Sequence, residues 1–402
     1  MLNICKLRND FPLLRDHPSL SYLDNAASAL KPDVVIETVD RYYRQLGVNV
    51  HRGVYKLSYE ATEAYEEARS KIADFIGADF EEIVFTRGAS QALNLVAESY
   101  GMNFIEAGDE IITTELEHHS SHMPWLHVAQ KKGAKLIYVP LDKEGRITVE
   151  AFSKVLSAKT KVVAITYVSN VMGYVTPLKE IIRLAHEQKA VVSVDAAQAA
   201  PHMKIDVREL DCDFLSFSGH KLCGPTGIGV LYGKKDLLSA MPPVEFGGDM
   251  ADEVDRYQMT FKDIPYRFET GTPMIAEAIG LGAACDYLSS IGLDEIAKYE
   301  HMLKERALEQ LKQIPNVIIY NPSCETGILA FNINGVHPHD AASVFDKNDV
   351  CIRAGHHCAQ LITKWLQTMG TIRASFYFYN TEEDVTRFIQ SVREASLFFT
   401  GE

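Results

Sequence analysis

Phe214-Leu215-Ser216-Phe217-Ser218-Gly219-His220-Lys221 joins an apolar segment, typical of a buried strand, to a short turn that ends on a lysine. A second apolar run, residues 190–194, ends on a carboxylate, Asp195, which lies 26 positions before Lys221. A carboxylate at the mouth of a strand buried on both faces is costly unless a positive group meets it. Lysine forms a Schiff base with an aldehyde, and the protonated pyridinium nitrogen of pyridoxal 5'-phosphate (PLP) would meet Asp195. The pair therefore favours a PLP site, although the tetrapeptide 218–221 alone also fits a surface lysine in a loop.

The composition and charge of the chain indicate a globular protein and argue against nucleic-acid and membrane partners. The chain has 402 residues, of which 47% are hydrophobic and 23% charged, as in ordinary globular proteins of about two domains. The net charge of −14, with no Lys/Arg-rich block, argues against a nucleic-acid partner. Charges in residues 1–10 do not fit a signal peptide, and no apolar run approaches the ~18 residues of a membrane helix. We expect a cytoplasmic protein with no membrane partner.

Seven cysteines, an odd number with no C-x-x-C pair, fit neither a disulfide framework nor a thiolate zinc site. The histidine-rich segment Glu117-His118-His119-Ser120-Ser121-His122 does not have the His-Glu-x-x-His spacing of a zinc site. We therefore expect no metal. His118, which is nearest a predicted strand end, is expected to lie flat on the planar cofactor ring.

The order of predicted elements indicates the fold class. Apolar runs at 83–86, 110–113, 135–139, 162–167 and 190–195 alternate with helix-like segments, which predicts an α/β domain with a mostly parallel sheet flanked by helices. After about residue 285 a helical stretch, 294–313, precedes strand-like runs at 327–333, 350–353 and 371–376, which predicts a smaller α+β domain. We place the large domain at 21–285 and the small C-terminal domain at 286–402, with residues 1–20 packing against the latter.

Ligands of such sheets bind beyond the carboxyl ends of the strands. Ser90, His118, Asn170, Asp195 and Lys221 all follow predicted strand ends. The turn 87–90 is expected to hold the cofactor phosphate through helix N-terminal amides and the hydroxyl of Ser90, an ordinary N-cap serine being the alternative. Further candidates for these contacts are Ser218 and His220 at the phosphate, and Asn170 and Gln198 near the phenolic oxygen, Gln198 lying one helical turn beyond Asp195 if a helix begins there.

A second signal is the stretch Arg353-Ala354-Gly355-His356-His357-Cys358-Ala359-Gln360. Its glycine and two histidines make Cys358 a candidate reactive thiol, and a buried structural thiol is the alternative. Arg373, within an otherwise apolar strand-like run, is a candidate partner for a substrate carboxylate, with a structural salt bridge as the competing interpretation.

With these motifs in hand, the chain resembles the class V aminotransferase family and, within it, the SufS-type (group II) cysteine desulfurases. The likeness runs nearly end to end and is carried by Leu23-Asp24-Asn25-Ala26-Ala27-Ser28, His51-Arg52-Gly53, Glu117-His118-His119, Val194-Asp195-Ala196-Ala197-Gln198, Ser218-Gly219-His220-Lys221, Gly224-Pro225-Thr226-Gly227-Ile228-Gly229, Arg267-Phe268-Glu269-Thr270-Gly271-Thr272-Pro273 and the Cys358 stretch. The resemblance implies the PLP-dependent transferase fold (fold type I).

The resemblance also implies roles for individual residues. Lys221 would carry the cofactor, Asp195 would pair with its ring nitrogen, His118 would stack on the ring, and Cys358 would accept sulfur. The remaining contacts implied are Gln198 with the ring oxygen; Ala89, Ser90, Ser218 and His220 with the phosphate; Thr272 with the phosphate of the neighbouring subunit of a homodimer; Arg373 with Asn170 for the substrate carboxylate; and Arg353 and His51 in the cysteine pocket.

By the same resemblance the reaction converts L-cysteine to L-alanine, leaves a persulfide on Cys358 and supplies sulfur for iron–sulfur cluster assembly through a SufE-like or SufU-like acceptor protein. The alternatives are a selenocysteine lyase, or a class V aminotransferase or lyase in which Cys358 is incidental. The chain departs from the family pattern at Leu361-Ile362-Thr363, where proline is usual, at Cys223 and at Ala89. None of these positions carries a catalytic group.

Overall fold

The computed structural model describes residues 2–401. The larger of its two main sheets has seven strands. Its strand order is β2 (Ile83–Thr86), β8 (Gly229–Gly233), β7 (Phe214–Ser218), β6 (Val191–Asp195), β5 (Thr160–Thr166), β3 (Glu110–Thr113) and β4 (Lys135–Tyr138). β8 runs antiparallel to both of its neighbours, and the other strands share one direction. The predicted mostly parallel sheet is confirmed.

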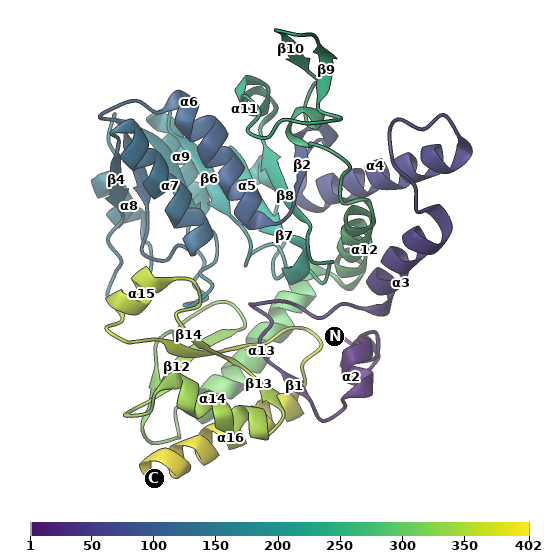
Figure 1. Ribbon diagram of the computed structural model, residues 1–402. Coiled ribbons are helices and arrows are strands. Elements are labelled where there is room, and N and C mark those ends of the chain that lie inside the picture. The colour runs from purple at the N-terminus through teal and green to yellow at the C-terminus, as the bar shows by residue number, and fades with distance from the viewer. Residues whose placement is uncertain (1, 402) are drawn as a thin grey trace.

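Helices cover both faces of this sheet, as Figure 1 shows. α5 (Ala89–Val96) and α7 (His119–Lys132) pack on one face, and α4 (Lys56–Ile76), α9 (Leu178–Glu187) and α12 (Ile275–Ile291) pack on the other. Successive side chains of a strand point to opposite faces of the sheet. Val84 of β2 therefore packs with α5 and α7, while its neighbours Ile83 and Phe85 pack with α4 and α12. Strands buried on both faces are apolar along their whole length, which is the pattern that the sequence shows.

A second, antiparallel sheet has the order β11 (Val317–Ile319), β12 (Ile328–Ile333), β15 (Thr371–Ser375) and β14 (Arg353–Gly355). It shares a hydrophobic core with α13 (Leu293–Leu311), α14 (Pro338–Lys347) and α16 (Glu382–Thr400), and lies below the large sheet in Figure 1. The other elements are α1 (Ile4–Asn9), α2 (Pro12–Asp16), α3 (Asp33–Arg41), α6 (Met102–Phe104), α8 (Val149–Val155), α10 (Val207–Leu210), α11 (Lys235–Ala240), α15 (Gln360–Trp365) and a hairpin of β9 (Ala251–Val254) and β10 (Met259–Phe261).

The N-terminal segment contacts the C-terminal part of the chain. Arg8 donates from Nη1 to the Tyr379 carbonyl oxygen (3.0 Å) and pairs with Asp384 (3.1 Å). The short strand β1 (Ser21–Tyr22) runs parallel to β13 (Val350–Cys351). The predicted boundary at residue 285 falls inside α12, and the division into two domains stays a prediction.

The antiparallel pair β7–β8 fixes the ends of the turn that carries Lys221. Ser218 and Gly229 are register partners, so the loop 219–228 begins and ends on one pair. A Cβ added at Gly229 would lie 2.4 Å from the Cα of Gly88, so only glycine lets the turn after β2 lie this close to β8. Three strand ends therefore meet at one edge of the sheet. Over residues 2–401, no helix is both long enough and apolar enough to cross a membrane.

Candidate active site

A cavity of about 170 Å³ lies at this edge, between the carboxyl ends of the large sheet and the second sheet. It brings together every predicted site residue except His51 and Thr272. These residues are Ala89, Ser90, His118, Asn170, Asp195, Gln198, Ser218, His220, Lys221, Arg353, Cys358 and Arg373. Residues that follow the strand ends of the large sheet thus share one small space, as the parallel topology predicts, and the second sheet and its loop add Arg353, Cys358 and Arg373.

Half-buried Lys221 and buried Asp195 form an ionisable pair in this cavity. Lys221 ends a 3₁₀ turn (Gly219–Lys221) after β7, and Asp195 is the last residue of β6. Burial lowers the pKa of Lys221 to about 8, although the carboxylate of Asp195 opposes this shift. Burial raises the pKa of Asp195, whose Oδ1 accepts the Ala197 amide at 2.9 Å. A lysine with this pKa is partly neutral near pH 7, which is the form that attacks a carbonyl or removes a proton.

His118 caps α7, the helix that begins beside the cavity. Its Nδ1 accepts the Ser120 amide at 3.1 Å, so the neutral ring carries its proton on Nε2. Burial, with a further effect of Lys221, lowers the pKa of His118 to about 4. The ring is therefore neutral at pH 7 and suits a flat stack on an aromatic ring better than an ion pair.

Hydroxyl and amide groups gather at the part of the cavity where β2 leads into α5. The Ala89 amide donates to Ser218 Oγ at 2.8 Å, and the hydroxyls of Ser90 and Ser120 are 2.6 Å apart. Burial lowers the pKa of His220 to about 4. This group of hydroxyl and amide donors is the kind of site that binds a phosphate.

Two arginines line the side of the cavity formed by the second sheet. Arg373 of β15 is buried and donates from Nη1 to the Asn170 carbonyl oxygen (2.8 Å) and from Nη2 to Asp24 (3.2 Å). Arg353 of β14 is exposed and is the register partner of Arg373. Two cations at one cavity wall form a site for a carboxylate.

Cys358 lies in the loop between β14 and α15 and is exposed in the single chain. Its carbonyl oxygen accepts the His119 amide at 2.7 Å, and the carbonyl oxygen of His357 accepts Nδ2 of Asn170 at 2.7 Å. His357 and Cys358 both have left-handed φ angles, 52° and 55°. Because such angles are uncommon for side chains of this size, the backbone contacts are what hold the cysteine loop in place.

The structure corrects one local expectation and moves two residues away from the cavity. No helix begins after Asp195; residues 197–202 form a turn, and Gln198 donates from Nε2 to the Ala26 carbonyl oxygen at 2.7 Å. His51 bonds Glu66 instead (2.6 Å), and Thr272 is exposed and lines a different hollow. Within one chain these two residues do not reach Lys221.

Three residues of the site were not predicted as functional. Asp24 pairs with Arg373, and His357 is buried, lines the cavity and bonds Thr371 at 2.9 Å. Glu117 is fully buried, accepts Thr114 Oγ1 and the Thr166 amide (both 2.9 Å) and Ser121 Oγ (2.7 Å), and has its pKa raised by burial to about 8. The first and last lie in motifs that the sequence analysis quoted, Leu23-Asp24-Asn25 and Glu117-His118-His119, which was the available signal.

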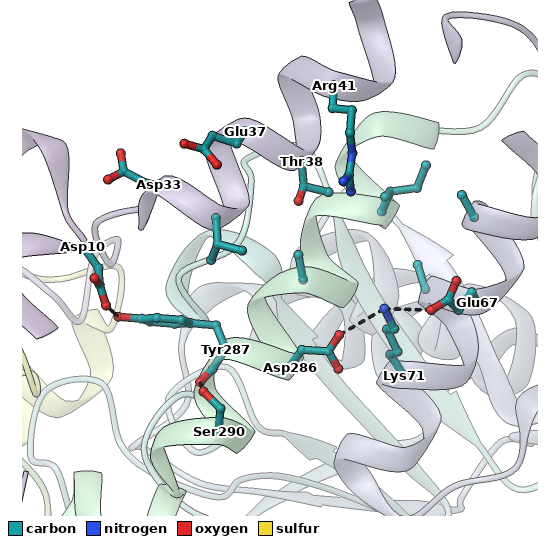
Figure 2. Close-up of a pocket in the computed structure, with 15 residues that line it drawn as sticks. Asp10, Asp33, Glu37, Thr38, Arg41, Glu67, Lys71, Asp286, Tyr287 and Ser290 are labelled. Carbon is teal, nitrogen blue, oxygen red and sulfur yellow. Dashed lines mark hydrogen bonds and ion pairs between the residues drawn. The ribbon is translucent and has the colours of Figure 1, made fainter. Parts of the chain in front are cut away.

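A larger hollow, of about 760 Å³, lies between α3, α4 and α12 (Figure 2). Its lysine, Lys71, is paired with Glu67 (2.9 Å) and Asp286 (3.0 Å), and these carboxylates raise its pKa. A charged, doubly paired lysine cannot act as a nucleophile. The chemistry therefore belongs to the smaller cavity. Over residues 2–401, no three His, Cys, Asp or Glu side chains are grouped as a metal site would require.

Comparison with known proteins agrees with this geometry. The sequence profile described as Aminotransferase class-V matches residues 21–388. A protein from Halalkalibacterium halodurans named probable cysteine desulfurase is 52% identical over 402 residues, covering 99% of each chain. Two solved structures also superpose. The apo cysteine desulfurase of Thermococcus onnurineus has a TM-score of 0.95 and 41% identity over 99% of each chain, and the cysteine desulfurase CsdA of Escherichia coli has 0.93 and 39% over 98% of each.

The enzymes of this family are PLP-dependent, and the chain has their fold-type I architecture, a large, mostly parallel sheet between helices. The match spans both sheets and the loop that carries Cys358. The chain therefore belongs to the class V aminotransferase family and, within it, to the cysteine desulfurases.

Proposed function

We propose that this protein is a PLP-dependent desulfurase that converts L-cysteine to L-alanine, holds the sulfur as a persulfide on Cys358 and supplies it for iron–sulfur cluster assembly. One observation carries the proposal. A half-buried lysine beside a buried carboxylate shares a cavity of about 170 Å³ with an exposed thiol and an arginine. An ordinary aminotransferase has no use for a thiol at that place.

The residues of the cavity fit PLP. Asn170 Oδ1, Gln198 Oε1 and Arg373 Nε are buried polar atoms without a hydrogen-bond partner in the described chain, and such atoms point to a ligand. Lys221 would link to the aldehyde carbon, and Asp195 would meet the ring nitrogen. The other contacts proposed are His118 on the ring face, Gln198 and Asn170 near the ring oxygen, and Ala89, Ser90, Ser218 and His220 at the phosphate.

When bound, PLP would take up the electron pair that the substrate Cα loses with its proton. The chain's own residues do the rest. Lys221, with a pKa of about 8, removes the Cα proton, and Arg373 with Arg353 holds the substrate carboxylate. Asn170, whose carbonyl oxygen accepts from Arg373, fixes the direction of that guanidinium.

Cys358 receives the sulfur. Its thiolate attacks the substrate sulfur, a new S–S bond forms, and the Cβ–S bond breaks with its electron pair left on carbon. The proton that the Cys358 thiol gave up is balanced by one taken up at Cβ, so alanine and a persulfide form without an external oxidant or reductant. Asn170 and His119, through their bonds to the carbonyl oxygens of residues 357 and 358, hold the thiol at the cavity mouth.

We propose a homodimer in which Thr272 reaches the cofactor phosphate of the second copy and His51 lies at its cysteine pocket. Strongly exposed apolar side chains support this. Val54 (88% exposed), Tyr257 (92%) and Val254 (70%) lie on two segments that the Arg52–Asp249 ion pair joins. Strongly exposed apolar side chains on adjoining segments are what an interface would cover. Light scattering should give twice the chain mass of 44.9 kDa, and an active monomer would refute the dimer.

The sulfur acceptor is proposed to be a SufE-like or SufU-like protein, and the location is proposed to be the cytoplasm. All seven cysteines are free, as suits a reducing compartment. The chemistry at Cys358 requires only that an acceptor thiol reach the exposed loop between β14 and α15.

The test is to incubate the PLP-loaded protein with L-cysteine, measure alanine, and map the persulfide by mass spectrometry of the peptide that contains Cys358. Cys358→Ser should bind cysteine but form no enzyme persulfide and release almost no alanine. Normal desulfuration by this variant would overturn the proposal. L-Selenocysteine is the parallel substrate, and a protein that turns over it alone would be a selenocysteine lyase.

A further inference from the structure

Arg69 of α4 is a fully buried arginine outside the cavity, held by two carboxylates. Its Nη1 and Nη2 donate to Oε1 and Oε2 of Glu269 at 2.6 and 3.0 Å, and its Nε donates to Glu66 Oε2 at 2.9 Å. Nη1 also donates to the Ile83 carbonyl oxygen at 2.8 Å. The guanidinium is therefore fixed in position and direction by a two-pronged ion pair.

Aromatic rings surround this cation and exclude water. The guanidinium carbon lies 4.5 Å from the ring centroid of Phe85, 5.3 Å from that of Tyr65 and 5.6 Å from that of Tyr266. Buried ion pairs rarely stabilise a fold more than apolar side chains would, because the charges lose their hydration. The geometric precision of this pair therefore suggests a role in placing chain segments.

The two carboxylates belong to the two segments that hold the displaced site residues. Glu269 lies three residues before Thr272, with Gly271 between them in a left-handed conformation (φ 75°). Glu66 accepts His51 Nε2 at 2.6 Å. One guanidinium thus anchors both Thr272 and His51, the two predicted site residues that do not reach the cavity of their own chain.

Glu269 also accepts the Phe85 amide at 2.7 Å, in the strand that leads to Ala89 and Ser90 of the same chain. Arg69 therefore has two routes to a cofactor phosphate: within its own chain through β2, or across the dimer through Thr272. The route through β2 runs along a strand already fixed by pairing with β8 over its whole length. The segment 269–273 has no such partner strand among the described residues, so Glu269 has more effect there.

We propose that Arg69, through Glu269, is a positioning residue that aims Thr272 at the cofactor phosphate in the second copy of the chain. This rests on the proposed homodimer and on the proposed role of Thr272. Arg69 itself touches neither cofactor nor substrate.

The test measures cofactor affinity in mixed dimers, with pyridoxal 5'-phosphate as the probe and the visible absorbance of cofactor linked to Lys221 as the signal. Arg69→Lys keeps the charge and removes the fork. The Arg69→Lys homodimer should bind the cofactor about tenfold more weakly, as expected for the loss of about one hydrogen bond to a charged group. Arg208→Lys is the matched control, because Arg208 makes a similar forked pair with Glu82 (3.2 and 2.6 Å) and should bind as the parent does.

A mixed dimer of Lys221→Ala and Arg69→Lys chains, isolated through two affinity tags, decides between the routes. Its single linkable site uses Lys221 of the Arg69→Lys chain and Thr272 of the chain with intact Arg69. Parental affinity there supports the proposal, and weak affinity there, or parental affinity in the Arg69→Lys homodimer, overturns it. If Arg69→Lys does not fold, Glu269→Gln takes its place in the same mixed dimer. A monomer in sedimentation would instead overturn the proposed dimer, which separates the two failures.

Discussion

Arg353 and Arg373 face each other directly across the antiparallel pair β14–β15. Like charges in register destabilise a sheet by roughly 0.2–1 kcal/mol. Asp24 offsets part of the repulsion by pairing with Arg373 at 3.2 Å, and Arg353 has no ion-pair partner in residues 2–401. The substrate-free protein therefore holds an excess of positive charge at one wall of its cavity, which a carboxylate relieves.

Replacing Arg353 should separate stability from function. Arg353→Met removes one of the opposed charges, so we expect the free energy of unfolding of the substrate-free protein to rise by about 0.5 kcal/mol. The protein should therefore unfold at a slightly higher urea concentration. The same change removes a charged hydrogen bond to the substrate, so kcat/KM for cysteine should fall roughly 10- to 100-fold. Arg353→Lys keeps the charge and should show no gain in stability. Unchanged kcat/KM in Arg353→Met would show that this arginine does not hold the substrate.

The lowered pKa of Lys221 predicts how fast the cofactor-free protein couples PLP. With a pKa of about 8, roughly one-tenth of the amine is neutral at pH 7. The coupling rate should therefore rise about tenfold from pH 6 to pH 7 and level off above about pH 8, whereas an ordinary lysine would continue to gain to about pH 10. Stopped-flow absorbance measures this profile.

Reduction of the coupled protein identifies the lysine that binds PLP. Borohydride reduction and peptide mapping should place the pyridoxyl group on Lys221, and Lys221→Ala should show no visible absorbance. Lys71→Ala, which changes the paired lysine of the hollow in Figure 2, should couple PLP at the parental rate. A pyridoxyl group on another lysine would refute the assignment.

Glu117 should make the wild-type protein lose stability as pH rises. Burial raises its pKa from an ordinary 4.5 to about 8, so between these values the folded state keeps a proton that the unfolded state has released. The free energy of unfolding then falls as pH rises through that window. Glu117→Gln has no such proton. Its stability relative to wild type, from urea titrations of cofactor-free protein, should increase from about pH 5 to about pH 8.

Glu253→Gln, on the exposed hairpin β9–β10, is the control for Glu117 and should follow wild type across the same range. A constant difference between Glu117→Gln and wild type would mean that Glu117 ionises normally and that the hydroxyls of Thr114 and Ser121 stabilise its charge.

The bonds to the cysteine loop predict slow release of sulfur. Because His119 and Asn170 hold the carbonyl oxygens next to the thiol, Cys358 cannot swing far, and an acceptor must come to it. Rapid-quench measurements without acceptor should show a burst of about one alanine per site followed by a slow phase, as when a late step limits turnover. A suitable acceptor should accelerate only the slow phase. Absence of a burst would place the slow step before persulfide formation.

Most strands of the large sheet, and the gathering of the candidate residues at one edge of it, were predictable from the sequence for a common physical reason. Strands buried on both faces must be apolar throughout, so the polar residues that end them, such as Asp195 and Lys221, stand out. Helix versus turn after Asp195 was not predictable, because four residues carry too little periodic signal.

The remaining site residues depend on packing. Asp24 and Glu117 are carboxylates whose contacts lie in distant parts of the chain, and local sequence does not predict such contacts. His51 and Thr272 matched family motifs, but a single chain does not bring them to Lys221. If the dimer is correct, their place depends on a surface that is complete only when two chains meet.

The closed loop between Ser218 and Gly229 has a mechanical consequence. Because its ends are paired, the backbone under Lys221 cannot travel, and only the four-carbon side chain can move between linking the cofactor and taking a proton. Lys221 thus has a flexible side chain on a backbone segment that is held at both ends. Lys221→Ala would leave a space where the lysine side chain had been, with the surrounding backbone unchanged. A small free amine such as methylamine could enter this space and take up protons in place of the lost side chain. Added methylamine should then restore part of the turnover.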